Sequence, residues 1–129
     1  MTTIVLVTGG FDPLHSGHIE YFKAAKNLGD KLVVGVNSDA WLIRKKGRPF
    51  MPWTERCVII ENLSMVDQVI GVMNDDRFDD AGGAIFKLLS TNSSNVDIIV
   101  ANGGDRKQGN VPEEVTYGDH QNVSFVYGV

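Results

Sequence analysis

The chain has 129 residues, which is enough for one domain with a single hydrophobic core. Apolar residues make up 43% of it and charged residues 22%, and the net charge of −4 argues against a general nucleic-acid-binding surface. Cys57 is the only cysteine, which excludes an intramolecular disulfide, and no secretory leader or membrane-spanning apolar run is visible. We therefore expect a cytoplasmic protein whose partners are neither nucleic acid nor membrane.

Short apolar runs alternate with helical patterns along the chain. They predict strands at residues 4–7, 31–36, 66–72, 96–101 and 123–127, helices at 17–28, from 54 and after 80, a helical turn at 40–43 and a short helix from 112. This alternation predicts an α/β fold, a doubly wound parallel sheet of about five strands, in a single domain over residues 1–129.

Capping residues predict where the helices begin and end. Ser16 is the expected N-cap of the first helix, and Gly29 is its expected stop. Thr54 is expected to cap a later helix whose buried side carries Val58 and Ile59.

Three polar stretches follow strands, at residues 9–18, 37–39 and 102–106. Because doubly wound sheets bind ligands beyond the carboxyl ends of their strands, we expect these stretches to lie together at that edge. The first stretch reads G-G-F-D-P-L-H-S-G-H, so a strand ends in glycines and opens onto a helix. Bare backbone N–H groups beside a helix N-terminus are typical of a phosphate site.

His15 and His18 lie at the mouth of this helix and add side-chain donors to the same place. A single histidine is more often a surface or core residue without chemistry, but a pair in this context favours a site. A structural zinc site is not expected, because Asp12 is the only nearby carboxylate or thiol.

The order of the motifs resembles the cytidylyltransferase-like nucleotidyltransferases, which carry an H-x-G-H signature after the first strand of a Rossmann-like sheet. The matching segments are residues 10–18 with G-F-D and H-S-G-H, 28–39, the R-P and E-R pairs at 48–49 and 55–56, V-D-Q-V-I at 66–70 and G-G-D at 103–105. The match covers nearly the whole chain in the right order, so the chain is identified as a member of this family.

The resemblance implies a nucleotidyltransferase, in which an acceptor phosphate attacks the α-phosphate of a nucleoside triphosphate and pyrophosphate is released. The transferred group is AMP or CMP, the acceptor is a small phosphorylated sugar or polyol, Mg²⁺ accompanies the triphosphate, and the assembly is a homodimer. Residues 37–39 and 103–105 look most like those of the heptose-phosphate adenylyltransferases, rather than the glycerol-phosphate cytidylyltransferases, which favours ATP.

Such a reaction needs donors that align two anions and stabilise charge on the α-phosphoryl oxygens. The expected catalytic residues are His15, His18, Lys46 and Arg56; the nucleotide-binding residues are Gly9, Gly10, Phe11, Asp12, Gly17, Gly103 and Asp105; the acceptor-binding residues are Asp39, Arg44, Lys45 and Arg48. No resident metal site is expected.

Several of these residues also have simpler interpretations. The basic stretch at 44–49 reads as a loop that holds the β- and γ-phosphates or the acceptor phosphate, or that is only solvated. Arg56 alternatively forms a surface ion pair with Glu55 or Glu61. Asp39 and Asp105 alternatively cap turns. Asp12 is expected either to orient a histidine or to reach a hydrated Mg²⁺.

One feature of the family is not found. Its members usually continue past the fifth strand into a segment of the type S-T-T-x-I that contacts the triphosphate, whereas this sequence ends at Val129. A nucleotide-binding module without turnover is therefore the alternative hypothesis. A synthetase-like adenylate former ranks last, because the short chain offers no second domain.

Overall fold

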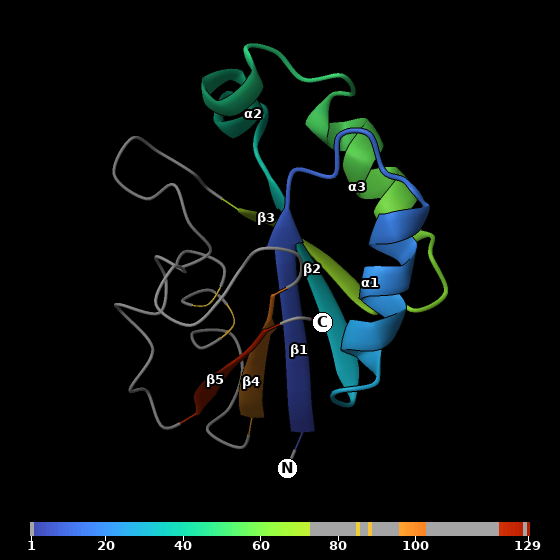
Figure 1. Cartoon of the computed structure of the whole chain (residues 1–129), viewed down its shortest axis with the longest axis vertical. Coiled ribbons are helices and arrows are strands. Elements are labelled where there is room, and N and C mark those ends of the chain that lie inside the picture. The colour runs from blue at the N-terminus through green and yellow to red at the C-terminus, as the bar shows by residue number, and fades with distance from the viewer. Residues whose placement is uncertain (1, 73–84, 86–87, 89–95, 103–121, 128) are drawn as a thin grey trace.

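The computed structural model describes residues 2–72, 85, 88, 96–102, 122–127 and 129 (Figure 1). Its elements, in chain order, are β1 (Thr2–Gly9), α1 (Ser16–Lys26), β2 (Lys31–Asn37), α2 (Asp39–Lys46), α3 (Trp53–Glu61), β3 (Gln68–Val72), β4 (Val96–Ala101) and β5 (Val123–Val126). All five strands were predicted from the apolar runs, with ends that differ by a few residues.

The five described strands form one parallel sheet in the order β3-β2-β1-β4-β5. The chain therefore builds outward from β1 to β3 on one side and then continues at β4 on the other side of β1. This arrangement confirms the predicted Rossmann-like, doubly wound α/β fold. The strand order reverses beside β1, so the crevice beyond the carboxyl ends of β1 and β4 is where such a sheet binds ligands.

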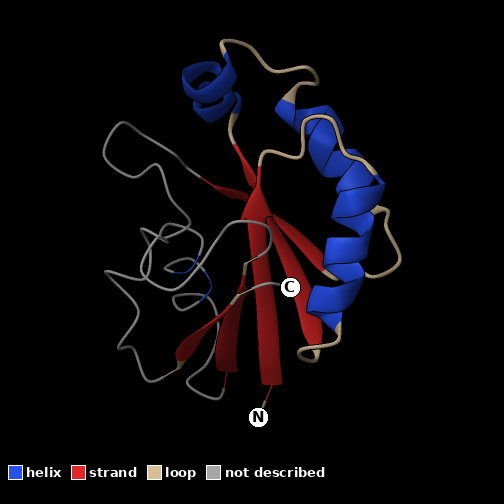
Figure 2. Ribbon diagram, in the orientation of Figure 1, coloured by secondary structure: helices blue, strands red, loops and turns tan. Residues whose placement is uncertain are grey.

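Alternating side chains of the central strands face two separate clusters of the core. Val5 and Val7 pack with Phe22 of α1 and Ile60 of α3, and Figure 2 shows both helices on the same side of the sheet. Ile4, Leu6, Ile98 and Val100 face the opposite side, where they pack with Ile85 and Leu88. Both faces of the middle strands are thus buried, as parallel sheets require.

The predicted ends of the first helix were wrong in detail. The N-cap is His15 and not Ser16, and the C-cap is Asn27 in an ordinary right-handed conformation. Gly29 is needed for a different reason: a Cβ there would lie 2.8 Å from Val5 Cγ2 and 3.0 Å from the Thr3 carbonyl oxygen. Glycine at this position allows the chain to pass close to β1.

The first half of the basic stretch, residues 44–46, is helical, which corrects its interpretation as a loop. Ser38 caps α2 by accepting a hydrogen bond from the Trp41 N–H at 3.1 Å, and α2 continues to Lys46. Gly47 ends this helix at φ 92°, a conformation that glycine adopts without strain. Arg44 to Lys46 therefore share one helix, and Arg48 follows in the loop.

The third helix buries a different side from the one predicted. Its N-cap is Pro52, and Val58 and Ile59 are 52% and 38% exposed. Arg56 and Ile60 face the sheet instead. Arginine is rarely buried, but the hydrogen bonds that the Arg56 guanidinium makes allow the protein to bury it.

Two further helix predictions fall largely outside the described residues. Ile85 and Leu88 are helical and buried, as the pattern from residue 80 predicts, while the helix predicted from residue 112 lies entirely outside. Among the helices that the structure describes, none has the length and apolarity needed to span a membrane.

A charged hydrogen-bond network joins α1, β2 and β3 at the amino ends of these strands. Asp67 Oδ2 accepts from the Leu32 N–H at 2.8 Å and from Lys26 Nζ at 2.5 Å. The Lys26 hydrogen bond, followed by the Leu32 one, holds the pKa of the Asp67 carboxyl below its usual value. The ionised carboxylate therefore stabilises the folded state.

We expect Asp67→Asn to lower the free energy of unfolding at pH 7 by about 0.5–1 kcal/mol, a value reduced for the partial exposure of the pair. Because the folded-state pKa is depressed, the stabilisation is present above the unfolded pKa of about 4 and is lost as the pH falls through the folded pKa. Urea unfolding of both proteins at pH 7 and pH 3 tests this. Glu20→Gln on exposed α1 is the control, and an equal Asp67→Asn deficit at both pH values would contradict the prediction.

Candidate active site

The two histidines cap the first helix. His15 is the N-cap residue, and its Nδ1 accepts a hydrogen bond from the Gly17 N–H at 3.1 Å. His18 Nδ1 in turn accepts one from the His15 N–H at 3.2 Å. The two rings stack with their centroids 3.9 Å apart and their planes inclined by 24°. The histidine pair thus takes the place of the Ser/Thr and Glu/Gln of an ordinary capping box.

These hydrogen bonds decide which ring nitrogen carries the proton. A backbone N–H bonds to an unprotonated nitrogen, so in the neutral rings both Nδ1 atoms are bare and the proton lies on Nε2. His15 is exposed and His18 is half-buried. Two Nε2–H groups therefore lie at a helix N-terminus, where the helix dipole also favours an anion.

Phe11 packs against one ring of the histidine pair, that of His18. It is buried, adopts a left-handed φ of 51°, and meets His18 edge-on with ring centroids 5.1 Å apart. A Cβ on Gly9 would lie 3.0 Å from the Phe11 ring, and a Cβ on Gly17 would lie 2.9 Å from the His15 ring. These two glycines therefore leave room for the rings, and their contact with a nucleotide stays a prediction.

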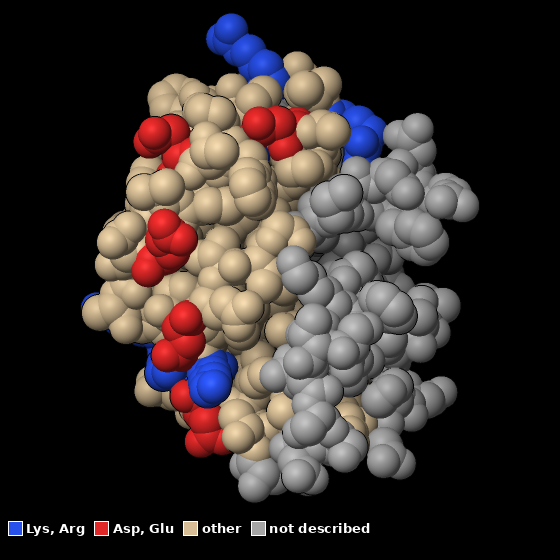
Figure 3. Space-filling view, turned by 180° about the vertical axis from the view of Figure 1, so that it is seen from behind, with Lys and Arg blue, Asp and Glu red and all other residues tan. Residues whose placement is uncertain are grey.

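The basic helix α2 packs directly on the glycine turn. A Cβ on Gly10 would lie 2.9 Å from Leu42 Cδ2 and 3.1 Å from the Trp41 ring, and Leu42 is fully buried. α2 lies beyond the carboxyl ends of the strands, beside the turn that leaves β1 (Figure 1). Basic residues are seen at this end of the molecule, with acidic residues near them (Figure 3). The exposed Arg44 thus lies on the helix that packs beside the histidine turn.

Asp12 makes contacts that the sequence did not predict. Its carboxylate is buried, with Oδ1 accepting from the Met51 N–H at 2.6 Å and Oδ2 accepting from the Phe50 N–H at 2.5 Å. Both oxygens are thus directed at the loop between α2 and α3. The sequence does not predict this contact, because both donors to Asp12 are backbone N–H groups, which have no side-chain signature.

Arg56 is buried, so its alternative interpretation as a surface ion pair with Glu55 or Glu61 was wrong. Nε donates to the Met51 carbonyl at 3.0 Å, and Nη1 donates to the Gly10 and Asn37 carbonyls at 2.8 Å each. The fourth bond runs from Nη2 to Asp39 Oδ1 at 2.6 Å. The side chain has no exposed surface, and its contact with a substrate stays a prediction.

The remaining predicted residues divide into three groups. Asp39 lies at the start of α2 with a side chain 40% exposed, and it pairs with Arg56. Arg44, Lys45 and Lys46 lie at the end of α2 and Arg48 follows it, and of these Arg44 and Arg48 have exposed side chains. Gly103 and Asp105 lie outside the described residues.

Tyr21, which the motifs did not single out, donates from its hydroxyl to the Ala101 carbonyl and joins α1 to the carboxyl end of β4.

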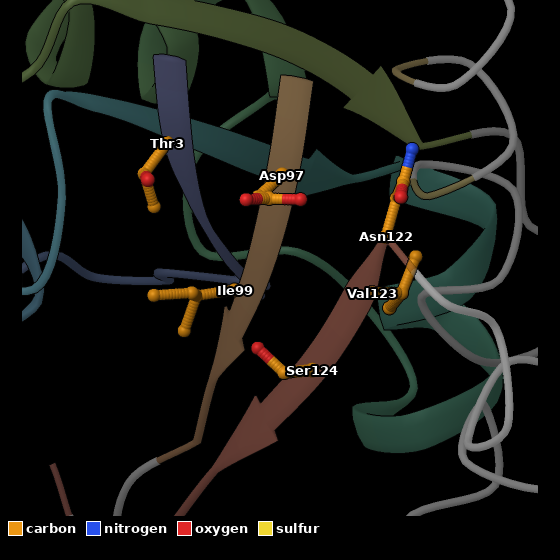
Figure 4. Close-up of a pocket in the computed structure, with 6 residues that line it drawn as sticks. All are labelled: Thr3, Asp97, Ile99, Asn122, Val123 and Ser124. Atoms are coloured by element: carbon orange, nitrogen blue, oxygen red, sulfur yellow. The ribbon is translucent and has the colours of Figure 1, made fainter. Parts of the chain in front are cut away.

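A hollow on the sheet lies away from this site (Figure 4). It is lined by Thr3, Asp97, Ile99, Asn122, Val123 and Ser124. None of these six residues is basic, and the hollow contains a carboxylate. A triphosphate requires positive charge or clustered N–H donors, so the hollow is a poor candidate for an anion.

Cys57 is a poor candidate for a nucleophile. It packs at the edge of the cluster beneath α3, and burial raises the pKa of its thiol, although the Arg56 charge acts in the opposite direction. A raised pKa leaves less thiolate at neutral pH, and the thiolate is the reactive form.

Known proteins share both the sequence and the fold. Residues 6–106 match the profile of the family described as "Cytidylyltransferase-like". The chain belongs to this family.

Two similar curated proteins are both named "Bifunctional protein HldE". The one from Nitratiruptor sp. is 41% identical over 106 residues, covering 81% of this chain and 21% of the relative. The one from Erwinia tasmaniensis is 38% identical over 136 residues, covering 98% and 25%. The chain thus spans a quarter or less of these relatives.

Solved structures share the fold of this chain. A lipopolysaccharide core biosynthesis protein from Thermoplasma volcanium aligns with a TM-score of 0.75 and 29% identity, covering 100% of this chain and 98% of that one. A bifunctional NMN adenylyltransferase/ADP ribose pyrophosphatase from Francisella tularensis aligns with a TM-score of 0.65 and 15% identity, covering 98% of this chain and 38% of that one. At 15% identity, the second similarity shows the fold alone.

We expect Gly17→Ala to displace the His15 ring while leaving the protein folded. The new Cβ would meet the end of a side chain that can rotate, and alanine is the better helix former by about 1 kcal/mol. The measurement is the ring ¹³C–¹H NMR shifts of His15 and His18, together with thermal unfolding. Ser16→Ala, at the neighbouring exposed position, is the control. Unchanged histidine shifts in Gly17→Ala would show that the glycine is not needed for the ring geometry.

Proposed function

We propose that this chain transfers a nucleotidyl group from a nucleoside triphosphate, ATP in preference to CTP, to a small phosphorylated sugar or polyol. The observation that carries the proposal is the capping of α1 by His15 and His18. Their Nδ1 atoms accept from the backbone, which puts the proton of each neutral ring on Nε2, at a helix N-terminus. Fixed donors of this kind stabilise charge that develops on a phosphoryl group.

In the proposed reaction, an oxygen of the acceptor phosphate attacks the α-phosphorus. The bond from the α-phosphorus to the oxygen that bridges to the β-phosphate breaks, and pyrophosphate leaves with that electron pair. The acceptor phosphate is already an anion at neutral pH, so no general base is needed. His15 and His18 donate hydrogen bonds to the α-phosphoryl oxygens, whose charge increases in the transition state.

The cations of α2 and the following loop are assigned to the other phosphates. Arg44, Lys45, Lys46 and Arg48 are proposed to hold the β- and γ-phosphates or the acceptor phosphate, because side chains of α2 pack on the glycine turn. Mg²⁺ enters in this proposal as part of the metal–triphosphate substrate, coordinated by phosphate oxygens. Gly103 and Asp105 are proposed to contact the nucleotide, on the basis of the family motif alone.

The choice of substrates rests on the relatives. The resemblance of residues 37–39 and 103–105 to heptose-phosphate adenylyltransferases favours ATP and a sugar phosphate. The Thermoplasma volcanium protein, which is similar over its whole length, is described as a lipopolysaccharide core biosynthesis protein, and such cores are built from sugars.

We expect release of pyrophosphate when the protein is incubated with ATP, Mg²⁺ and a panel of sugar and polyol phosphates. His15→Ala and His18→Ala should each lower kcat by about 100- to 1,000-fold, the usual cost of removing one transition-state donor. Glu20→Gln, on the exposed side of the same helix, should leave turnover unchanged. The assay follows pyrophosphate with ATP and CTP compared.

Two results would overturn the proposal. One is binding of a nucleotide without turnover of any acceptor, which would favour a binding module. The other is full activity in both histidine variants, which would place the chemistry elsewhere.

A further inference from the structure

The loop between α2 and α3 is held at a single residue, Met51, through both its backbone N–H and its backbone carbonyl. The Met51 N–H donates to Asp12 at 2.6 Å, and the Met51 carbonyl accepts from Arg56 at 3.0 Å. The preceding Phe50 N–H donates to the other oxygen of Asp12. Asp12 lies in the turn that carries the histidines, 38 residues before Phe50 and 39 residues before Met51. These bonds therefore join the histidine turn to the loop.

The Arg56 guanidinium extends this connection to the ends of two strands. Its Nη1 bonds the Gly10 carbonyl just after β1 and the Asn37 carbonyl at the end of β2, and its Nη2 bonds Asp39 at the start of α2. Four of its five N–H groups are therefore used by the protein. Asp12 and Arg56 are 7% and 1% exposed, so two buried charges each depend on these partners.

We infer that Asp12 and Arg56 are positioning residues that together hold the basic segment, defined as residues 44–48, in place relative to His15 and His18. This inference rests on the proposed function, and it gives the two residues a different task from direct contact with substrate. The segment between Gly47 and Pro52 contains no helix or strand. The path of this loop, which carries Arg48, is therefore set by the bonds at Phe50 and Met51. The start of α2, the helix that carries residues 44–46, is held by the bond from Arg56 to Asp39.

Alignment is the reason that such a clamp matters for catalysis. The reaction joins two phosphates that repel each other, and small displacements of the groups that hold them lower the rate steeply. Lysine keeps the charge of Arg56 but lacks the planar fork that reaches several acceptors at once. Asparagine keeps the size of Asp12 but offers one acceptor oxygen in place of two.

The experiment compares Asp12→Asn and Arg56→Lys with the wild type by two independent measurements. Amide hydrogen exchange at Phe50 and Met51 should become roughly tenfold faster or more. In Asp12→Asn these amides lose their charged acceptor, and in Arg56→Lys the Met51 carbonyl loses the donor that holds the loop. In steady-state kinetics, kcat should fall by about 10- to 100-fold with a smaller change in KM. The NMR shifts of the His15 and His18 rings should remain those of the wild type.

Asp30→Asn is the matched control. Asp30 also accepts a backbone hydrogen bond through its carboxylate, from the Thr3 N–H at 2.8 Å, but at the opposite end of β1. This variant removes the same type of interaction, and it should change neither exchange at residues 50 and 51 nor kcat.

The two measurements separate the possible outcomes. Slower turnover with unchanged exchange at Phe50 and Met51 would overturn the inference and favour direct contact with substrate. Faster exchange with unchanged kcat would also overturn it, because the position of the loop would not matter.

If Asp12→Asn does not fold, the same two measurements on Arg56→Lys test the inference. A wild-type protein without turnover would refute the proposed function, and unchanged exchange in both variants would refute the clamp separately.

Discussion

The burial of one guanidinium constrains the whole end of the molecule where the candidate site lies. A buried charge is tolerated only when its hydrogen-bonding groups have partners, and Arg56 finds them in four different segments. The carbonyls of Gly10 and Asn37, the Asp39 carboxylate and the Met51 carbonyl must therefore converge on one point. The turn after β1, the end of β2, the start of α2 and the loop before α3 owe their mutual arrangement to this convergence.

The histidine pair shows how a structural requirement and a chemical one are met by the same atoms. A helix begins with unpaired N–H groups that need acceptors, and the Nδ1 atoms of His15 and His18 accept from two backbone N–H groups at this end. That use leaves the opposite nitrogen of each ring as a donor. Phe11 below and the absence of a side chain on Gly17 keep the rings stacked. The chemistry therefore depends on local geometry that the helix itself maintains.

Patterns within one segment were predicted well, and contacts between segments were not. The apolar runs around Val5, Val33 and Ile98 predicted buried strands because burial on both faces requires continuous apolar sequence. The prediction of which side of α3 faces the sheet was wrong. It put the apolar Val58 inside, whereas the charged Arg56 is buried. Likewise the partners of Asp12 are backbone N–H groups, which every residue except proline carries. No composition or spacing distinguishes the two that it binds.

The sequence by itself determined the alternation of strands and helices, the glycine turn with its two histidines, and membership of the cytidylyltransferase-like family, because these depend on neighbours in the chain. The tertiary structure decided which nitrogen of each histidine accepts from the backbone, that residues 44–46 lie on a helix beside the turn, and that Asp12 and Arg56 bind the loop at Met51. Those outcomes depend on distances between groups that are far apart in sequence, and only folding brings such groups within hydrogen-bonding reach.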